Sequence, residues 1–237
     1  MMRKNGIGSL ILDVLFPKVC FRCKREGSYL CQDCLATLEV LESSFCLCEK
    51  PQRLAEAGKC RNCRKKQLDG LYFAISYQNN LVKNLIRQFK YEPYIKELAV
   101  PLALLIITHF NLIQKQFPVE NYIMIPVPLT KKKMKQRGFN QSEELAKEIS
   151  ENLGIPVVTE CLLKIKETPP QMELSAEERM ENIKGVFAIK NDEKLKNKKI
   201  FLVDDVYTTG STMEEAAGVL KKYGAKEVWG IVVARGQ

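Results

Sequence analysis

Two carboxylates, Asp204 and Asp205, directly follow the apolar run 200–203 and shortly precede a turn of small residues at 208–212. If the apolar run is a strand, the pair lies at its carboxyl end, where open α/β sheets bind their ligands. Two carboxylates at that position can accept hydrogen bonds from a vicinal diol or hold a hydrated divalent cation. The N–H groups and the positive dipole end of a helix that begins in the turn suit a phosphate. This acid pair and the phosphate turn together indicate a site for a ribose 5-phosphate.

The phosphate turn consists of Thr208, Thr209, Gly210, Ser211 and Thr212. Its hydroxyls add hydrogen-bond donors, and its glycine allows the backbone to approach a ligand closely. Taken separately, the two features have simpler interpretations, namely an acidic pocket of the flavodoxin type and an ordinary capped helix start. Their close succession after an apolar strand favours a ligand site.

The segment LVDDVYTTGST resembles the phosphoribosyl diphosphate (PRPP) signature of type I phosphoribosyltransferases. In that family the acidic residues bind the ribose 2- and 3-hydroxyls, and the following loop binds the 5-phosphate. The resemblance assigns these binding and catalytic roles to Asp204, Asp205 and the phosphate turn. It also implies Mg²⁺ bound together with PRPP.

Such a site also needs a place for diphosphate, the leaving group. The segment 131–137, which we interpret as a basic loop, supplies its cations from Lys131, Lys132, Lys133, Lys135 and Arg137. Positioned cations and Mg²⁺ would stabilise the charge that develops on the leaving oxygen. Arg137 is the best candidate for a catalytic role, because its planar fork matches phosphate oxygens and Gly138 allows close approach. Lysines 131–133 could equally belong to a solvated surface loop.

The polar segment 168–184 is longer than an ordinary connection, which favours a functional role. Phosphoribosyltransferases have a flexible loop that closes over PRPP and excludes water, and the resemblance implies that this segment could serve as one. The candidate contacts of this lid are Gln171, Arg179 and Asn182. An alternative is that they are polar surface residues of a short helix.

Eight of the nine cysteines lie between Cys20 and Cys63, in four closely spaced pairs. Two such pairs can hold one tetrahedral zinc ion through four thiolates. Sequential assignment gives one site to Cys20, Cys23, Cys31 and Cys34, and a second to Cys46, Cys48, Cys60 and Cys63. An interleaved arrangement is also open, and we expect one or two structural Zn²⁺ sites because a single residue separates Cys46 from Cys48. The ninth cysteine, Cys161, lies in an apolar segment and is expected in the core.

The start of the chain imitates a signal peptide, with an apolar run at 7–16. Asp13 interrupts this run and no small-residue cleavage site follows, so we interpret it as a short amphipathic helix that Pro17 ends. The most apolar stretch, 98–107, is far shorter than the roughly 20 residues that a membrane span needs. We therefore predict a cytoplasmic protein with reduced thiols and no membrane span. The net charge of +9 favours anionic partners but discriminates poorly among them.

Alternating strand-like and helix-like segments must position these residues. Strands are predicted at 71–77, 122–129, 156–165, 185–189, 198–206 and 227–235, with helices from 81, ending near 116, before Gly154 and at 211–223. This order predicts an α/β fold with a Rossmann-like, mostly parallel sheet flanked by helices. The resemblance of the PRPP signature implies that this fold is of the type I phosphoribosyltransferase kind. We predict two domains, a helix with a double zinc-ribbon module at 1–68 and the phosphoribosyltransferase domain at 69–237.

The combination of motifs resembles the ComF/GntX family across essentially the whole chain. These motifs are LFPxxCxxC, the cysteine knuckles, a KY pair at Lys90 and Tyr91, RGFNQSxxLA and the PRPP signature. Members of the family are called amidophosphoribosyltransferase-like. The competence branch is implicated in natural transformation, where it handles incoming single-stranded DNA in the cytoplasm. The resemblance also implies a helicase-like DNA-uptake ATPase as a partner.

Two classes of function remain. The first is a PRPP-binding protein of natural competence, whose DNA-binding candidates are Lys83, Arg87, Lys90, Phe89, Tyr91 and Tyr94 together with the basic loop. An alternative is that those residues belong to an ordinary amphipathic helix with solvated lysines. The second class is an active phosphoribosyltransferase that transfers ribose 5-phosphate from PRPP to a base or an amine.

Overall fold

The computed structural model describes residues 17–113, 121–167, 183–190 and 193–236. The chain divides into two compact units, Met1–Glu39 and Val40–Gln237. In the smaller unit, a turn-rich segment leads into the short helix α2 (Gln32–Ala36), and the rings of Phe21 and Tyr29 stack 5.9 Å apart. The helix predicted at 7–16 lies outside the described residues.

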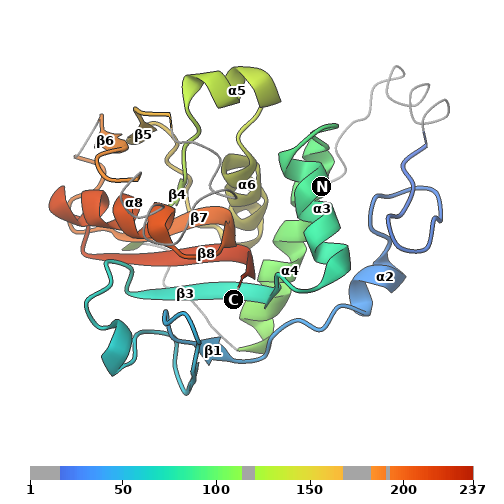
Figure 1. Ribbon diagram of the computed structural model, residues 1–237, viewed down its shortest axis with the longest axis horizontal. Coiled ribbons are helices and arrows are strands. Elements are labelled where there is room, and N and C mark those ends of the chain that lie inside the picture. Colours follow the sequence, from blue (N-terminus) through green and yellow to red (C-terminus); the bar gives the residue numbers. More distant parts are fainter. Residues whose placement is uncertain (1–16, 114–120, 168–182, 191–192, 237) are drawn as a thin grey trace. The chain divides into compact units, whose positions relative to one another are not determined.

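A four-stranded parallel sheet forms the centre of the larger unit (Figure 1). Its strands, in spatial order, are β3 (Gly70–Ser76), β8 (Glu227–Arg235), β7 (Lys199–Tyr207) and β4 (Tyr122–Pro126). Every neighbouring pair is parallel. The two central strands are β7 and β8, and their nearly continuous apolar sequences suit strands that are covered on both faces. The predicted mostly parallel α/β sheet is confirmed.

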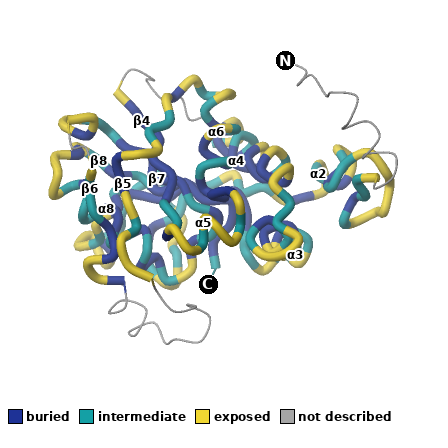
Figure 2. Tube along the Cα trace, turned by 90° about the horizontal axis from the view of Figure 1, so that it is seen from above, coloured by how far each residue is buried: buried dark blue, intermediate teal, exposed yellow. Residues whose placement is uncertain are grey.

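Helices cover both faces of this sheet. The elements around it are α3 (Asn80–Lys90), η2 (Lys96–Leu98), α4 (Ala99–Leu112), α5 (Lys131–Arg137), α6 (Gln141–Leu153) and α8 (Ser211–Lys222). Helices α4 and α6 pack against each other on one face, and α8 lies on the other (Figures 1 and 2). None of the helices among the described residues combines the length and the apolar character needed to cross a bilayer.

Side chains of β7 alternate between the two faces and so fill both layers of the core. Ile200 and Leu202 belong to the apolar cluster that also contains residues of α8, such as Leu220. Phe201 is fully buried and stacks on Tyr122 with ring centroids 4.5 Å apart. This packing fixes the strand whose carboxyl end delivers the acid pair.

The segment 156–165, predicted as one strand, is divided in the structure. Val157 forms an isolated parallel bridge with Met124, which adds one short pairing beyond β4. A bend at Glu160 and Cys161 then separates it from β5 (Leu162–Lys164), which pairs antiparallel with β6 (Phe187–Ile189). The prediction of a single continuous strand was wrong because this bend takes the chain out of the main sheet.

The predicted basic loop is instead the helix α5. Its N-cap residue Thr130 accepts a 3.4 Å hydrogen bond from the backbone N–H of Lys133. Its C-cap residue Gly138 has a left-handed φ of 79°, which closes the helix. Lys, Met, Gln and Arg are all good helix formers, and the two caps are sufficient to end a helix of this length at both sides.

The segment before the sheet contains the short antiparallel pair β1 (Ser44–Phe45) and β2 (Arg53–Leu54) and the 3₁₀ turn η1 (Arg61–Cys63). Within the larger unit, Leu47, Cys63 and Leu68 are part of the apolar cluster that contains β7 and α8. The second cysteine group therefore packs in the same compact unit as the sheet. A domain boundary after residue 68 stays a prediction.

Candidate ligand-binding site and metal centres

The acid pair lies near the carboxyl end of β7. Asp205 is 2% exposed, and its Oδ1 accepts a 2.9 Å hydrogen bond from Nζ of Lys90, the last residue of α3. Asp204 is half-buried, and its Oδ1 accepts 2.9 Å hydrogen bonds from Ser142 Oγ and from the backbone N–H of Asp205. The end of α3 and the start of α6 thus meet β7 at the acid pair.

The acid pair and Lys90 perturb one another electrostatically. Burial and the neighbouring Asp205 carboxylate raise the pKa of Asp204 to about 6, against the opposing effect of Lys90. Burial alone would lower the pKa of Lys90, but attraction to Asp205 and Asp204 outweighs burial and raises this pKa. Lys90 contacts Asp205 directly, whereas Asp204 is hydrogen-bonded to Ser142 and to a backbone N–H. Two adjacent acidic side chains in this arrangement suit a ligand that brings hydroxyl donors or a divalent cation.

The phosphate turn connects β7 to α8 and contains a glycine that the geometry requires. Gly210 has a left-handed φ of 81°, and a Cβ at this position would lie 2.2 Å from the hydroxyl oxygen of Tyr207. As the N-cap residue of α8, Gly210 has no side chain that could compete with a ligand for the N–H groups of the first turn. The hydroxyls of Thr209 and Ser211 lie 2.9 Å apart beside it. The turn therefore presents a helix N-terminus flanked by hydroxyls, as a phosphate site requires.

Helix α5 brings some of its cations toward this region and exposes the others. The side chain of Arg137 donates a 2.8 Å hydrogen bond to Gln141 Oε1 and lies 5.9 Å from the centre of the Tyr91 ring. Lys133 is half-buried, and burial together with the charge of Arg137 lowers its pKa. Lys131 and Lys132 are exposed. Of the predicted lysines, Lys133 is thus the one whose surroundings most favour an anionic ligand.

Lys164 on β5 is a cation near the acid pair that sequence reasoning missed. Burial and repulsion from Lys133 lower its pKa to about 8, with Lys90 contributing in the same direction and Asp204 opposing. These interactions place Lys164 in the same electrostatic neighbourhood as the acid pair. The sequence gives little signal for this role, because Lys164 lies in an apolar segment outside every motif.

Two further residues of the site are Ser142 and Lys90. The sequence motifs predict no role for either of them in binding a ribose phosphate. Ser142 belongs to the RGFNQS motif, so that motif could have marked it as a candidate. The predicted lid residues Gln171, Arg179 and Asn182 lie outside the described residues. Their role stays a prediction.

The cysteines form the two groups that sequential assignment gives. Within each group of four, the Sγ atoms all lie within 4.8 Å of one another. Pairs of sulfur atoms are 3.6 Å apart for Cys23 and Cys31 and 3.4 Å apart for Cys48 and Cys60. A tetrahedral zinc site with Zn–S bonds of about 2.3 Å has S–S edges of about 3.8 Å, so both groups fit this metal. Backbone N–H groups also point at sulfur, since Gln52 N lies 3.2 Å from Cys46 Sγ.

We expect metal analysis of the full chain to find two zinc ions per protein, one for each four-cysteine group. Cys48→Ser removes one ligand of the second group and is expected to leave about one ion, because a structural zinc site needs four ligands. Cys161→Ser, which alters a buried cysteine outside both groups, is the matched control and should retain two. A wild-type value near one would contradict occupancy of the second group.

Comparison with known families agrees with this geometry. Residues 138–237 match the family model described as "Phosphoribosyl transferase domain". The matched region begins at the C-cap of α5 and includes the acid pair and the phosphate turn.

Curated relatives extend the similarity toward the N-terminus. The chain is 39% identical over 116 residues to "Competence protein F" of Haemophilus influenzae, which covers 47% of this chain and 50% of that protein. It is 26% identical over 208 residues to "Competence protein ComFC" of Bacillus subtilis, covering 82% of this chain and 79% of the relative. It is 28% identical over 221 residues to "DNA utilization protein YhgH" of Salmonella typhimurium, covering 89% and 87%. The match thus spans half the length of the first relative and more of the other two.

Proposed function

We propose that this chain, which belongs to the ComF family of phosphoribosyltransferase-like proteins, binds PRPP and acts in natural competence in the handling of incoming single-stranded DNA. The observation that carries PRPP binding is the juxtaposition, on one strand–turn–helix unit, of the acid pair with the glycine-containing phosphate turn. We place the protein in the cytoplasm, where its thiols would stay reduced.

Each part of PRPP finds chemically suitable groups. The acid pair would accept hydrogen bonds from the ribose 2- and 3-hydroxyls, with Mg²⁺ bound beside it, and the phosphate turn would bind the 5-phosphate. Lys133, Arg137 and Lys164 would face the diphosphate, whose charge favours their protonated forms. Burial is the main cause that lowers the pKa of Lys164 and of Lys133, and repulsion from Lys133 and from Arg137, respectively, adds to it. A bound anion would relieve that repulsion, which supports this part of the proposal.

The diphosphate assignment predicts that PRPP binding takes up protons at alkaline pH. At pH 8.5 Lys164 is mostly neutral, because its pKa is about 8. Bound diphosphate would raise this pKa and so draw in up to about three-quarters of a proton. We expect the calorimetric heat of binding at pH 8.5 to depend on the ionisation enthalpy of the buffer, and the dependence to nearly vanish at about pH 7, where Lys164 is mostly protonated and Asp204 mostly ionised.

Lys164→Met should remove most of this proton uptake and weaken PRPP binding by about 10-fold, a typical value for one charge-assisted contact. The matched control is Lys166→Met, which alters an exposed lysine of the same segment and should keep the uptake. Heats independent of the buffer at pH 8.5 in the wild-type protein would remove Lys164 from the diphosphate site.

An exposed cationic surface supports the DNA-handling part of the proposal. Lys83 and Arg87 are exposed on α3, and Lys131, Lys132 and Lys135 are exposed on α5. Two contacts join the segment after α3 to α5, the Arg137–Tyr91 contact and a 3.2 Å hydrogen bond from Gln136 Nε2 to the hydroxyl of Tyr94. Exposed cations beside tyrosines suit a single strand, which they bind through its phosphates and bases.

Two of the predicted DNA-binding residues do not belong to this surface. Phe89 is fully buried and packs on Phe139, and Lys90 is paired with Asp205. The helical pattern of α3 explains the difference, because Phe89 lies on the apolar face of the helix and Lys90 at its end, against β7.

The second candidate function is an active phosphoribosyltransferase. In that reaction the bond between ribose C1 and the diphosphate oxygen breaks while a nitrogen of a base or amine bonds to C1. The cations near the acid pair favour this function, since they would stabilise the departing diphosphate. A helicase-like DNA-uptake ATPase is the partner proposed for the first function.

One experiment compares the two functions. The protein is incubated with PRPP, Mg²⁺ and a panel of bases and amines, and diphosphate release is measured. In parallel, the anisotropy of a labelled single strand is followed at several salt concentrations with and without PRPP. Salt-dependent binding that PRPP alters, without diphosphate release, supports the DNA-handling function. Turnover with one of the acceptors would instead favour the transferase.

A further inference from the structure

Arg235, the last residue of β8, joins the second cysteine group to the sheet. It is 4% exposed, and its guanidinium donates hydrogen bonds to the backbone oxygens of Cys46, at 2.6 Å, and of Cys48. A buried guanidinium is costly unless an anion compensates it. Four thiolates around one Zn²⁺ carry a net charge of −2, which would provide this compensation directly beside Arg235. The position of Arg235 therefore suits a metal-loaded second group.

Tyr207 joins Arg235 to the phosphate turn. The guanidinium lies 5.4 Å from the centre of the Tyr207 ring, which is itself 2% exposed. The ring also packs so closely against Gly210 that a Cβ there would lie 2.2 Å from the phenolic oxygen. The backbone N–H of Gly236 also donates a 2.8 Å hydrogen bond to the carbonyl of Tyr207. A continuous series of contacts thus connects the second cysteine group through Arg235 and Tyr207 to the phosphate turn.

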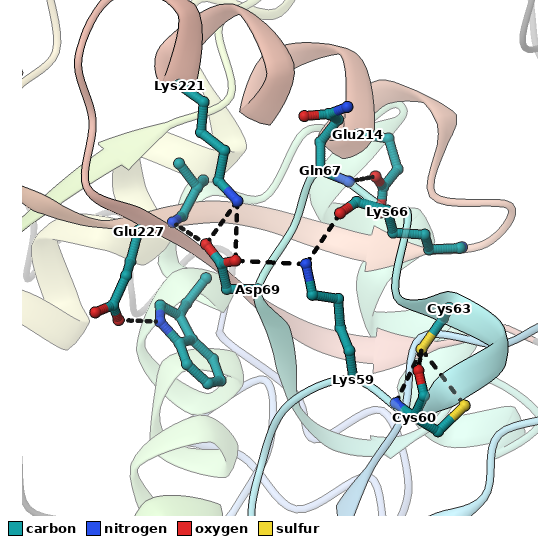
Figure 3. Close-up of polar contacts among 11 residues, drawn as sticks. Lys59, Cys60, Cys63, Lys66, Gln67, Asp69, Glu214, Lys221 and Glu227 are labelled. Atoms are coloured by element: carbon teal, nitrogen blue, oxygen red, sulfur yellow. Dashed lines mark hydrogen bonds and ion pairs between the residues drawn. The ribbon is translucent and has the colours of Figure 1, made fainter.

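A second connection runs from the Cys60–Cys63 knuckle to α8, the helix that the phosphate turn begins (Figure 3). Lys66 follows the knuckle in the sequence, and its Nζ donates a 3.1 Å hydrogen bond to the hydroxyl of Tyr207. The backbone N–H of the next residue, Gln67, donates a 2.5 Å hydrogen bond to Oε2 of Glu214 in the first turn of α8. The segment that follows the knuckle is therefore hydrogen-bonded to Tyr207, which contacts the phosphate turn, and to helix α8.

Asp69 fixes the same segment to the other end of α8. Its carboxylate accepts hydrogen bonds of 2.9 Å from Lys221 Nζ and 2.8 Å from the backbone N–H of Val228. Lys59, which precedes the knuckle, donates to the carbonyl of Lys66 at 3.1 Å and lies 3.5 Å from Asp69 (Figure 3). Residues 59–69 consequently hold both ends of α8, and a movement of the knuckle must disturb the helix that carries the turn.

We propose that the second cysteine group is the structural support of the phosphate turn, so that metal retention at this group and PRPP binding at the turn stabilise each other. The inference rests on the proposed PRPP site. Metal at Cys46, Cys48, Cys60 and Cys63 fixes the knuckle, Arg235 and Tyr207, and thereby keeps the turn in its binding conformation. Coupling between two sites is reciprocal, so bound PRPP must hold the metal more tightly by the same factor. The first group lies in the other compact unit and serves as an internal reference.

The test is the rate at which zinc leaves the full chain for a chromogenic chelator, measured with and without PRPP and Mg²⁺. We expect two kinetic phases in the wild-type protein, and we expect PRPP to slow one of them. In an equilibrium competition with the same chelator, PRPP should raise the zinc affinity of that site by about 10-fold, the middle of the usual range for coupled sites. Cys23→Ser and Cys48→Ser, which disrupt the first and the second group respectively, assign the phases. The slowed phase should persist in Cys23→Ser and be missing in Cys48→Ser. Asp204→Asn, which removes an acceptor for the ribose, is the control for direct binding of zinc by PRPP in solution. An effect of PRPP on zinc release that persists in this variant would come from such direct binding.

Arg235→Met should abolish most of the PRPP effect on zinc release, because it breaks the contacts to Cys46 and Cys48. Arg25→Met, which breaks an exposed ion pair with Asp33 in the smaller unit, is the matched control and should leave the effect intact. If calorimetry shows PRPP binding but the release rates and the affinities of both zinc sites are unchanged, the coupling is overturned and the PRPP site stands. If the zinc-loaded wild-type protein does not bind PRPP, the site and the coupling both fall.

Discussion

The Asp204→Asn substitution is expected to abolish PRPP binding and, at the same time, to stabilise the ligand-free protein. Loss of a charged acceptor for a ribose hydroxyl and for Mg²⁺ should weaken binding by at least about 100-fold, since hydrogen bonds to charged groups contribute about 1.5–3 kcal/mol each. The stabilisation has a separate cause. Burial and Asp205 raise the pKa of Asp204 to about 6, so the folded protein carries an unfavourable charge there at neutral pH.

The sign of the pH dependence follows from this shift. The pKa of Asp204 in the folded state lies above its value of about 3.9 in an unfolded chain, so folding takes up a proton between about pH 4 and pH 6. Above pH 6 the ionised carboxylate destabilises the folded state by up to roughly 3 kcal/mol, which partial exposure reduces to about 1–2 kcal/mol. Asparagine avoids this cost at pH 7.5, and its advantage should disappear as the pH falls below 4.

Asp205→Asn provides the matched comparison at the neighbouring position. It should also weaken PRPP binding, but it should lower stability, because it leaves Lys90 without its 2.9 Å partner. Denaturant unfolding at pH 7.5 and at pH 4 measures the opposite stability effects, and calorimetry measures PRPP affinity. Undiminished PRPP affinity in both variants would show that the acid pair does not bind the ribose.

The second large effect is expected from Gly210→Ala. Alanine is strained at the left-handed φ of 81°, and its Cβ would overlap the hydroxyl of Tyr207 at 2.2 Å. Because Tyr207 is buried under Arg235, the turn must move instead of the ring. We expect PRPP affinity to fall by at least about 100-fold and the free energy of unfolding to fall by about 2–3 kcal/mol, from backbone strain together with overpacking.

Gly154→Ala separates backbone strain from the contact with Tyr207. Gly154 has a similar φ of 70° and ends α6; in the described part of the chain, apart from its own neighbours in sequence, no atom lies within 4 Å of the position of a Cβ. Alanine there should cost about 1 kcal/mol of stability through backbone strain and leave PRPP affinity unchanged. If Gly210→Ala behaved like Gly154→Ala in both measurements, the turn would not be held by Tyr207 in the way that the geometry indicates.

The central strand–turn–helix unit could be predicted from the sequence because its signals are local. The apolar run of β7, the acid pair and the small residues of the turn follow one another directly, and a parallel strand buried on both faces is apolar almost throughout. The same reasoning placed β3, α3, α8 and β8 close to their observed bounds. Where hydrophobic period and turn residues agree, sequence alone specifies the element.

The composition of the site depends on contacts between distant segments, which local patterns do not reveal. The helical pattern predicts Lys90 on a cationic helix face, yet its partner Asp205 lies 115 positions away in the sequence. Lys164 sits on a strand that a bend separates from the main sheet, so its approach to Asp204 follows from tertiary structure. Helix α5 was missed for a different reason, because a run of lysines was interpreted by its charge although each of its residues favours a helix.

The cysteine groups likewise combine a feature that local spacing predicts with a long-range contact that it does not. Their spacing predicts which residues share a metal ion, and the clustered sulfur atoms agree. It does not predict that the second group lies against Arg235, 189 positions from Cys46 in the sequence. In the larger unit, Cys46 and Cys63 of this group belong to the apolar cluster that also contains residues of β7 and α8.

Calorimetric titration of the wild-type, zinc-loaded protein with PRPP in the presence of Mg²⁺ tests the central claim most directly. The proposed site predicts saturable binding of one PRPP per chain, and competition by ribose 5-phosphate, which can occupy the acid pair and the phosphate turn but not the diphosphate region. Absence of saturable heat at millimolar PRPP, from protein whose zinc content and cooperative unfolding show that it is intact, would contradict it.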